Sequence, residues 1–254
     1  MRRLIPPFIV AIFLVFTAVP ASATHSWRNY HWARTTQSFT LELGDNTTTA
    51  AWQDALGVAA TDWSASTVLD AVVAAGLTTD PSACRPTLGR VEVCNGKYGE
   101  KPWIGIASIW VYPGGHIAQG TVRNNDTYLD SPKYPQLSGQ EWKQFVMCQE
   151  IGHTFGLEHQ DEDLSNANLG TCMDYTRDPS GSLFGQASNE HPNRHDYEQL
   201  KTIYQHRDET TTVGVSGTAL GGSFTPSEGQ RGTSRFVTEL PNGGRLVTLV
   251  IWVP

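Results

Sequence analysis

A short run in the second half of the chain contains side chains that can bind a metal ion. Gln149 and His153 are four residues apart, Glu150 directly follows Gln149, and His159 lies six residues after His153. On a helix, residues four apart lie on the same face, so Gln149 and His153 can both point at one ion, with Glu150 beside them. Gly156 allows a sharp turn that ends the helix and returns His159 to the same ion.

This run and a later segment resemble a known family of peptidases. They read Gln-Glu-x-x-His-x-x-Gly-x-x-His over residues 149–159 and Met-Asp-Tyr over residues 173–175. The pattern resembles the zinc site and the methionine-containing turn of the metzincin metallopeptidases. With glutamine at its first position, the motif resembles that of the gametolysin family of cell-wall-degrading peptidases.

The resemblance implies a set of roles for these residues. His153 and His159 would be zinc ligands, with Gln149 as the third. A zinc ion with three protein ligands keeps a position open for water, whose pKa it lowers, and it polarises the peptide carbonyl. Glu150 would be the general base that takes a proton from this water and passes it to the leaving amine.

Gln149 departs from the family pattern, which has histidine at the first position. An amide oxygen is a weaker zinc donor than imidazole and suits harder ions, so we expect one catalytic Zn²⁺ ion, with another divalent metal as an alternative. Three interpretations remain: Gln149 binds the metal, another residue such as His116 or Tyr175 takes its place, or the site has decayed. The intact Glu150 and both histidines favour the first.

Other residues receive roles from the resemblance alone. Met173 would form the turn beneath the metal. Tyr175 would be an extra ligand or an oxyanion stabiliser, and a packed aromatic side chain is the alternative. Residues 116–124 would be the antiparallel edge strand that lines the cleft and pairs with an extended peptide. Glu162 and its neighbours Asp161 and Asp163 either orient the loop or a ligand or are solvated charges, and the second interpretation is favoured. The histidines at positions 25, 31, 191, 195 and 206 are interpreted as surface or capping residues.

Four cysteines form an even set, which favours disulfides over free thiols in an exported chain. Of three possible pairings, proximity in the sequence favours Cys84 with Cys94 and Cys148 with Cys172. The second pair would join the segment before Gln149 to the segment before Met173. The sequence contains no Cys-x-x-Cys pair, which argues against the alternative of a zinc-thiolate site.

The elements that must position these residues follow from the sequence pattern. Strands are predicted at residues 38–43, 67–75, 90–94, 104–112 and 116–124, the second of them buried, and helices at 50–66, from Ser138 to about Gly156, and at 191–206. Ser138 and Glu141 are interpreted as a capping box of the second helix. Residues 161–188 read as a long loop. Residues 235–240 and 245–253 flank Pro-Asn-Gly-Gly and predict a terminal hairpin.

This order of elements predicts an α+β (mixed α/β) fold with a metzincin-like twisted sheet, an active-site helix, a methionine turn and a C-terminal helix. The expected organisation is a signal peptide at residues 1–23, a catalytic domain at 24–207, and a linker with a small β-rich extension at 208–254. Residues 1–23 combine Arg2 and Arg3 with about 12 apolar residues and a small-x-small cleavage site. That apolar stretch is too short for a membrane span.

Composition narrows the class of partner. Without residues 1–23, the formal net charge falls from −7 to −9, which argues against nucleic acid. We expect a secreted, extracellular monomer that is not inserted in a membrane after signal removal and that acts on protein or peptide substrates as a zinc-dependent endopeptidase. The alternative is a catalytically silent module that keeps the cleft and binds peptides or a cell-surface polymer.

Overall fold

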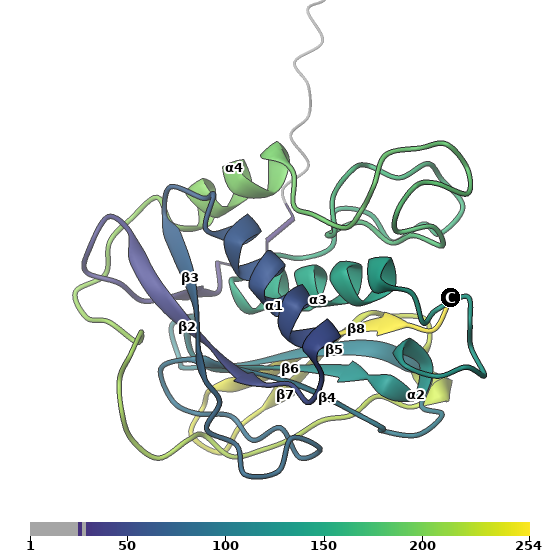
Figure 1. Cartoon of the computed structure of the whole chain (residues 1–254). Coiled ribbons are helices and arrows are strands. Elements are labelled where there is room, and N and C mark those ends of the chain that lie inside the picture. Colours follow the sequence, from purple (N-terminus) through teal and green to yellow (C-terminus); the bar gives the residue numbers. More distant parts are fainter. Residues whose placement is uncertain (1–24, 27–28) are drawn as a thin grey trace, which may run out of the picture.

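A mixed sheet of eight strands carries two long helices on one of its faces (Figure 1). This computed structural model describes residues 25–26 and 29–254, so the predicted signal peptide lies outside the described residues. The strands are β1 (His31–Trp32), β2 (Phe39–Asn46), β3 (Leu69–Ala75), β4 (Val91–Gly96), β5 (Trp103–Val111), β6 (His116–Asn125), β7 (Arg235–Glu239) and β8 (Arg245–Trp252). The mixed α/β class predicted from the sequence is confirmed.

The strand order is β3-β2-β4-β6-β5-β8-β7, and β1 pairs with β6 at one end. The strands from β3 to β6 in this order are parallel, whereas β5 is antiparallel to both β6 and β8. The prediction that residues 116–124 form an edge strand is therefore wrong, because β6 lies between β4 and β5. Its alternating polar residues suggest exposure, but the Gln119 amide exchanges two hydrogen bonds with the backbone of Leu220, which covers that face.

The helices of the described residues are α1 (Ala50–Trp63), α2 (Asp126–Leu129), α3 (Gln140–Thr154) and α4 (Arg194–Ile203), with a 3₁₀ turn η1 (Glu228–Gln230). None of them is long and apolar enough to cross a membrane. Helix α1 buries Trp63 against α3, where its indole donates to the carbonyl of Cys148 at 3.1 Å. A Cβ atom on Gly152 would lie 2.6 Å from this indole, so glycine permits the close crossing of the two helices.

Two local predictions about helix ends are corrected. Helix α3 begins after Gly139 without a side-chain cap, and the Ser138 hydroxyl donates to Pro135, so the predicted capping box is absent. The helix starts one residue later than that box requires. Helix α4 is shorter than predicted and begins at a capping box formed by Asn193 and Asp196. Strand β3 is an edge strand with one exposed face and is not buried.

The predicted C-terminal hairpin forms from β7 and β8, and it belongs to the main sheet. Strand β8 pairs with β5 along its length, and the hydroxyls of Ser108 and Thr248 lie 3.0 Å apart between them. Figure 1 shows this yellow strand beside β5, beneath α3. The sequence pattern gave no sign of this pairing partner.

Both disulfides favoured by the sequence are present, Cys84–Cys94 and Cys148–Cys172. The second joins α3 to the segment that carries Met173. The structure thus links the helix that carries Gln149 to the loop beneath it.

Candidate functional site

Two histidine rings converge at the end of α3. His153 occupies the last turn of the helix, and the chain then reverses at Gly156, whose φ of 99° is in the left-handed region. A Cβ atom at that position would lie 2.3 Å from the carbonyl oxygen of Tyr30, so only glycine fits the turn. The reversal returns His159, and the Nε2 atoms of the two histidines lie 2.9 Å apart.

Hydrogen bonds on the far side of each ring fix which nitrogen faces its neighbour. The Nδ1–H group of His153 donates to the carbonyl of Leu157 at 2.9 Å, and that of His159 donates to Glu162 at 2.7 Å. In the neutral rings both Nε2 atoms are therefore acceptors. Burial lowers the pKa of His153 well below its ordinary value, and the neighbouring His159 lowers it further, so His153 is neutral at physiological pH.

Glu162 has a role that the sequence interpretation underrated. The favoured interpretation as a solvated charge is wrong, because its carboxylate accepts a hydrogen bond from the ring of His159 and another from Ser234. The alternative, that this acid orients a neighbouring side chain, agrees with the structure. The hydrogen bond from His159 is the main cause that lowers the pKa of Glu162. A carboxylate on the outer nitrogen of a metal-binding histidine fixes the tautomer and raises the basicity of the ligand.

Gln149 lies one helical turn before His153, fully buried, and neither its amide oxygen nor its amide nitrogen has a hydrogen-bond partner. Such a group is costly to bury unless it meets a ligand or an ion. Two imidazole nitrogens on one tetrahedral zinc ion lie roughly 3.3 Å apart, close to the separation of the two Nε2 atoms. The two imidazole nitrogens are spaced as donors to one divalent cation, and the amide of Gln149, one helical turn away, is a donor type that such a cation accepts.

Glu150 is also fully buried, and its carboxylate lies against the backbone of β5. A Cβ atom on Gly105 would lie 2.4 Å from its Oε1 atom, so glycine makes room for this side chain. Burial raises the pKa of Glu150 well above its ordinary value, and the backbone N–H groups of Ala107 and Ile251 offset only part of this rise. Neither carboxylate oxygen has a hydrogen bond of normal geometry.

Met173 lies beneath the helix, in a loop tied to the chain that follows His159. Its carbonyl accepts from the Gln160 N–H at 2.6 Å, and the Tyr175 N–H donates to Asp161 at 3.0 Å. A Cβ atom on Gly152 would lie 2.7 Å from the sulfur of Met173. The loop therefore packs directly against the turn of α3 that carries His153.

Tyr175 packs edge-on against the ring of His159, with ring centroids 4.6 Å apart. Its hydroxyl donates to the carbonyl of Val250 in β8 at 2.5 Å. Burial raises the pKa of this hydroxyl well above its ordinary value. Tyr175 thus lies between the ring of His159 and strand β8.

The site is covered by the chain itself. Gln149, Glu150 and His153 have no exposed surface, and His159 is 6% exposed. Strand β8 contacts two of the surrounding side chains, through the carbonyl of Val250 and the N–H group of Ile251. Arg235 in β7 also pairs with Glu158, at 2.9 Å. The C-terminal hairpin therefore closes the side of the site that faces β5.

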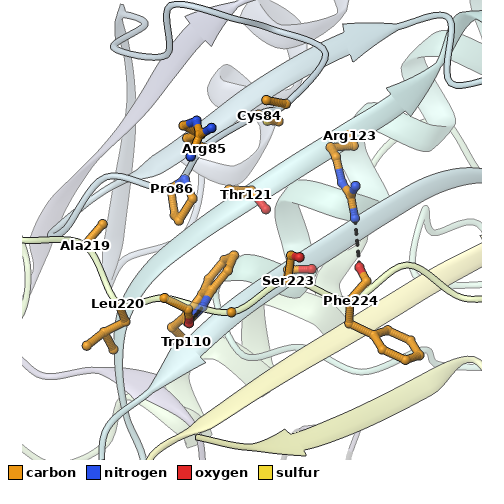
Figure 2. A pocket seen from close by; sticks show the side chains of 14 residues that line it. Cys84, Arg85, Pro86, Trp110, Thr121, Arg123, Ala219, Leu220, Ser223 and Phe224 are labelled. Atoms are coloured by element: carbon orange, nitrogen blue, oxygen red, sulfur yellow. Dashed lines mark hydrogen bonds between the residues drawn. The ribbon is translucent and has the colours of Figure 1, made fainter. Parts of the chain in front are cut away.

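A cavity of about 550 Å³ lies elsewhere, on the face of the sheet that points away from α3. Figure 2 shows Trp110, Thr121 and Arg123 pointing into it from β5 and β6, with Phe224 across from them. Arg123 donates to the carbonyl of Phe224 at 3.1 Å. None of the residues at positions 149–159 lines this cavity.

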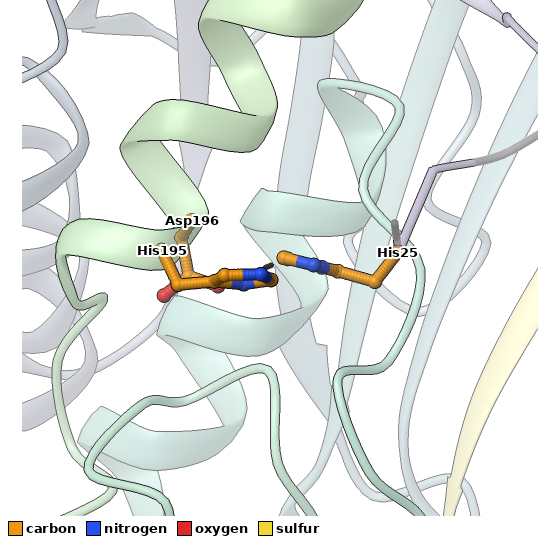
Figure 3. A group of neighbouring side chains, drawn as sticks. All are labelled: His25, His195 and Asp196. Atoms are coloured by element: carbon orange, nitrogen blue, oxygen red, sulfur yellow. Dashed lines mark hydrogen bonds and ion pairs between the residues drawn. The ribbon is translucent and has the colours of Figure 1, made fainter. Parts of the chain in front are cut away.

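Two of the histidines interpreted as surface or capping residues are buried, so they are not surface residues. His25 lies 3.1 Å from Asp196, and its ring stacks on His195 (Figure 3). Asp196 also accepts from Thr171 and from the backbone of Asn193 as part of the α4 cap. This group therefore fastens the start of the described chain to α4. The second buried histidine is His31.

His116 is not brought together with His153 and His159. Its ring contacts His31, and its Nε2 atom lies 3.2 Å from Asp208. The suggestion that it replaces Gln149 as a ligand finds no support in this position. Sequence reasoning also missed Gly105, for which the single glycine in an apolar strand was the available signal.

The comparisons with known proteins are distant. No protein-family model matches the chain, and no curated protein sequence matches it. Among solved structures, it is similar to high choriolytic enzyme 1, a hatching enzyme zinc-protease from Oryzias latipes (medaka fish), at 11% identity over 71% of this chain and 96% of that chain, with a TM-score of 0.38.

Two structures of myroilysin are also similar to this chain. One is 12% identical over 70% of this chain and 83% of that chain, with a TM-score of 0.39. The other is 11% identical over 74% and 97%, with a TM-score of 0.34. Because all three TM-scores lie below 0.5, inferences about chemistry depend on the geometry of the site.

Proposed function

We propose that this protein is a zinc-dependent endopeptidase, in which Gln149, His153 and His159 hold one zinc ion. The observation that carries the proposal is the convergence of two imidazoles, each oriented by a hydrogen bond on its far nitrogen, one helical turn from a buried amide with no partner. Bound zinc supplies an acidified water molecule and a Lewis acid for a peptide carbonyl.

Glu150 moves the proton in this proposal. Its place next to Gln149 and its buried carboxylate suit a group that takes a proton and returns it to a leaving amine. Burial keeps its pKa high in the covered site. A cation bound beside it would lower that pKa and favour the ionised form that accepts protons.

Strand β8 indicates the class of substrate. It lies antiparallel to β5 as an extended segment, with its backbone against Tyr175 and Glu150. Beyond it, Val253 and Pro254 reach a cavity of about 700 Å³ that Leu137, Trp142 and Leu183 also line. An extended peptide in the place of β8 would find both backbone partners and room for side chains, so the substrate is a peptide or an unfolded protein.

A substrate can reach the site only after the β7–β8 hairpin separates from β5. Because β8 occupies the edge of β5, a peptide cannot pair with β5 while β8 remains. Covered and open forms of one chain are then in equilibrium, and the open form is the one that cleaves.

The proposal includes the setting of the enzyme. Two disulfides suit an oxidising compartment, so the enzyme acts outside the cell after removal of residues 1–23. Residues 24–207 carry the catalytic groups, residues 208–254 are the cover, and the mature chain acts as a monomer. The net charge of the chain is negative, which favours protein over nucleic-acid substrates.

The test combines metal analysis with cleavage of a denatured protein substrate. Wild type, Glu150→Gln, Gln149→His and the control Glu141→Gln, on the first turn of the same helix, are compared. Because Glu141 also lines the cavity proposed for substrate side chains, the exposed carboxylate of Asp54 on α1 provides a second control, Asp54→Asn. We expect zinc in all of these proteins, a loss of cleavage of about 10²–10⁴-fold for Glu150→Gln, and unchanged cleavage for Asp54→Asn. Gln149→His should bind zinc more tightly than wild type because imidazole is the better donor.

Two outcomes overturn the proposal. If wild type neither binds zinc nor cleaves the substrate, whereas Gln149→His binds zinc and cleaves it, the site has decayed. If zinc binds and neither protein cleaves, but unfolded peptides bind, the chain is the silent binding module considered above.

A further inference from the structure

Three imidazoles surround one carboxylate oxygen at the end of the sheet where β1 meets β6. The Oδ1 atom of Asp208 lies 3.3 Å from the Nε2 atom of His31, 3.2 Å from that of His116 and 3.5 Å from that of His206. The Nε2 atoms of His31 and His206 lie 3.2 Å apart. None of these residues belongs to the site at positions 149–159.

Three separate segments of the chain supply these residues. His31 opens β1 and pairs in register with His116, which opens β6. His206 and Asp208 follow α4. Two hydrogen bonds join Arg34 to Asp208: the backbone N–H of Arg34 donates to Oδ2 at 2.9 Å, and the Asp208 N–H donates to the Arg34 carbonyl at 2.8 Å. The backbone thus holds one carboxylate oxygen and leaves Oδ1 directed at the histidines.

The protonation of His31 follows from its other ring nitrogen. Nδ1 lies 2.6 Å from the carbonyl oxygen of Asn29, so it carries a hydrogen and donates. In the neutral ring, Nε2 is then an acceptor, and it faces both the Asp208 carboxylate and the Nε2 atom of His206. Acceptors that face one another at this distance need an additional proton or a shared cation between them.

We propose that His31, His116, His206 and Asp208 form a second metal site, which binds Zn²⁺ through three Nε2 atoms and the Oδ1 atom. Neighbouring ligand atoms in a tetrahedral zinc site are roughly 3.3 Å apart, and the Oδ1 atom of Asp208 lies 3.2–3.5 Å from each of the three Nε2 atoms. The donor atoms of His31, His116 and Asp208 all lie within 4.8 Å of one another, and His206 adds a fourth donor 3.2 Å from the Nε2 atom of His31. Three imidazoles and one carboxylate suit zinc, and the hydrogen bond to Asn29 orients one ligand as metal sites require.

The burial of the cluster suits a metal that enters from solvent. The side chains of His31 and Asp208 are 7% and 8% exposed, whereas those of His116 and His206 are 33% and 50% exposed. Two ligands are therefore fixed in the interior, and two can close over an arriving ion. The group formed by His25, His195 and Asp196 differs, because Asp196 already accepts from Thr171 and from the α4 cap.

A metal here is structural. It ties the start of the described chain to the first residue of β6 and to the chain that leaves α4, so it stabilises contacts between distant segments of the sequence. Because the folded chain brings the ligands together, binding free energy adds to the stability of the folded state.

The test uses the full mature chain and zinc alone as the probe. The background variant His153→Ala/His159→Ala removes two ligands of the other proposed site. In that background, His116→Ala/His206→Ala is compared with the control His191→Ala, which alters an exposed histidine bonded to Asp62. Zinc content after equilibrium dialysis and the thermal midpoint with and without zinc are measured.

We expect one zinc ion per chain in the background and in the His191→Ala control, and none after His116→Ala/His206→Ala. Zinc should raise the thermal midpoint of the first two proteins only, and cobalt should give a four-coordinate visible spectrum in the same two. An equal zinc content in all three, or none in the background variant, overturns the proposal. Circular dichroism, and His116→Gln/His206→Gln as a second pair, separate loss of ligands from loss of fold.

Discussion

Glu162 accepts a hydrogen bond from His159 on the ring nitrogen opposite the one that faces His153. Replacing its carboxylate with an amide, Glu162→Gln, keeps the shape and removes the charge that raises the basicity of the ring. We expect zinc affinity to fall by about 10–100-fold, measured by competition with a chelator. Asp163→Asn removes a charge from the same loop without contact to His159 and should leave affinity unchanged. Equal losses in both variants would show a general effect of charge.

At the level of single residues, the sequence predicted the positions that depend on local geometry. The four-residue spacing of Gln149 and His153 and the turn at Gly156 require only a helix and its end, and the structure forms both. The partner of His159 was not predictable, because three acidic residues follow within four positions and only the folded loop selects Glu162. The contact between Gly105 and Glu150 was not predictable either, because it joins two segments that are distant in the sequence.

At the level of elements, the bounds of strands and helices were predicted more accurately than the order in which the strands pair in the sheet. Helix α1 and strands β4 and β5 form within a few residues of their predicted bounds, since apolar periodicity reports local structure. The position of β6 between β4 and β5, and of β8 beside β5, depends on pairing across the chain. Residues 219–224 cover the polar side chains on one face of β6, so this strand is buried although its sequence alternates as that of an exposed strand does.

Strand β8 offers a direct test of the proposed opening. Ser108 and Thr248 are opposite one another in β5 and β8, with hydroxyls 3.0 Å apart. Facing residues of antiparallel strands have Cα atoms about 4.5–5.5 Å apart, which suits a disulfide. We expect Ser108→Cys/Thr248→Cys to lose peptide cleavage once oxidised while keeping its zinc, as measured on a denatured substrate.

The controls for this crosslink are the two single variants under the same oxidising conditions. Each alters one side chain of the pair without joining the strands, so each should cleave as wild type does. A crosslinked protein that cleaves at the rate of its controls would show that β8 does not have to leave β5.

At the level of the whole molecule, the two disulfides should contribute differently. Cys148–Cys172 joins α3 to the loop of Met173, whereas Cys84–Cys94 joins β4 to a surface loop. Replacing Cys148 and Cys172 with serine should lower the free energy of unfolding by about 3 kcal/mol and weaken zinc binding. The matched serine pair at positions 84 and 94 should lower stability without weakening zinc binding. Chemical denaturation and zinc titration measure the two effects.

A zinc affinity that is unchanged by loss of Cys148–Cys172 would contradict this assignment. The disulfide would then stabilise the fold without positioning the metal ligands. Its position before Gln149 and Met173 would have no consequence for the site.

The pairing of β5 with β8 also sets the order of folding. Ser108 and Thr248 are 140 positions apart, so this contact closes a very long loop and forms after the local contacts of the sheet. Until it forms, β5 presents an unpaired edge that is rich in isoleucine and tryptophan, and such edges can pair with other chains. Strand β8 therefore protects β5 from pairing with other chains, and truncation before residue 245 should lower the yield of soluble protein, measured by centrifugation after expression.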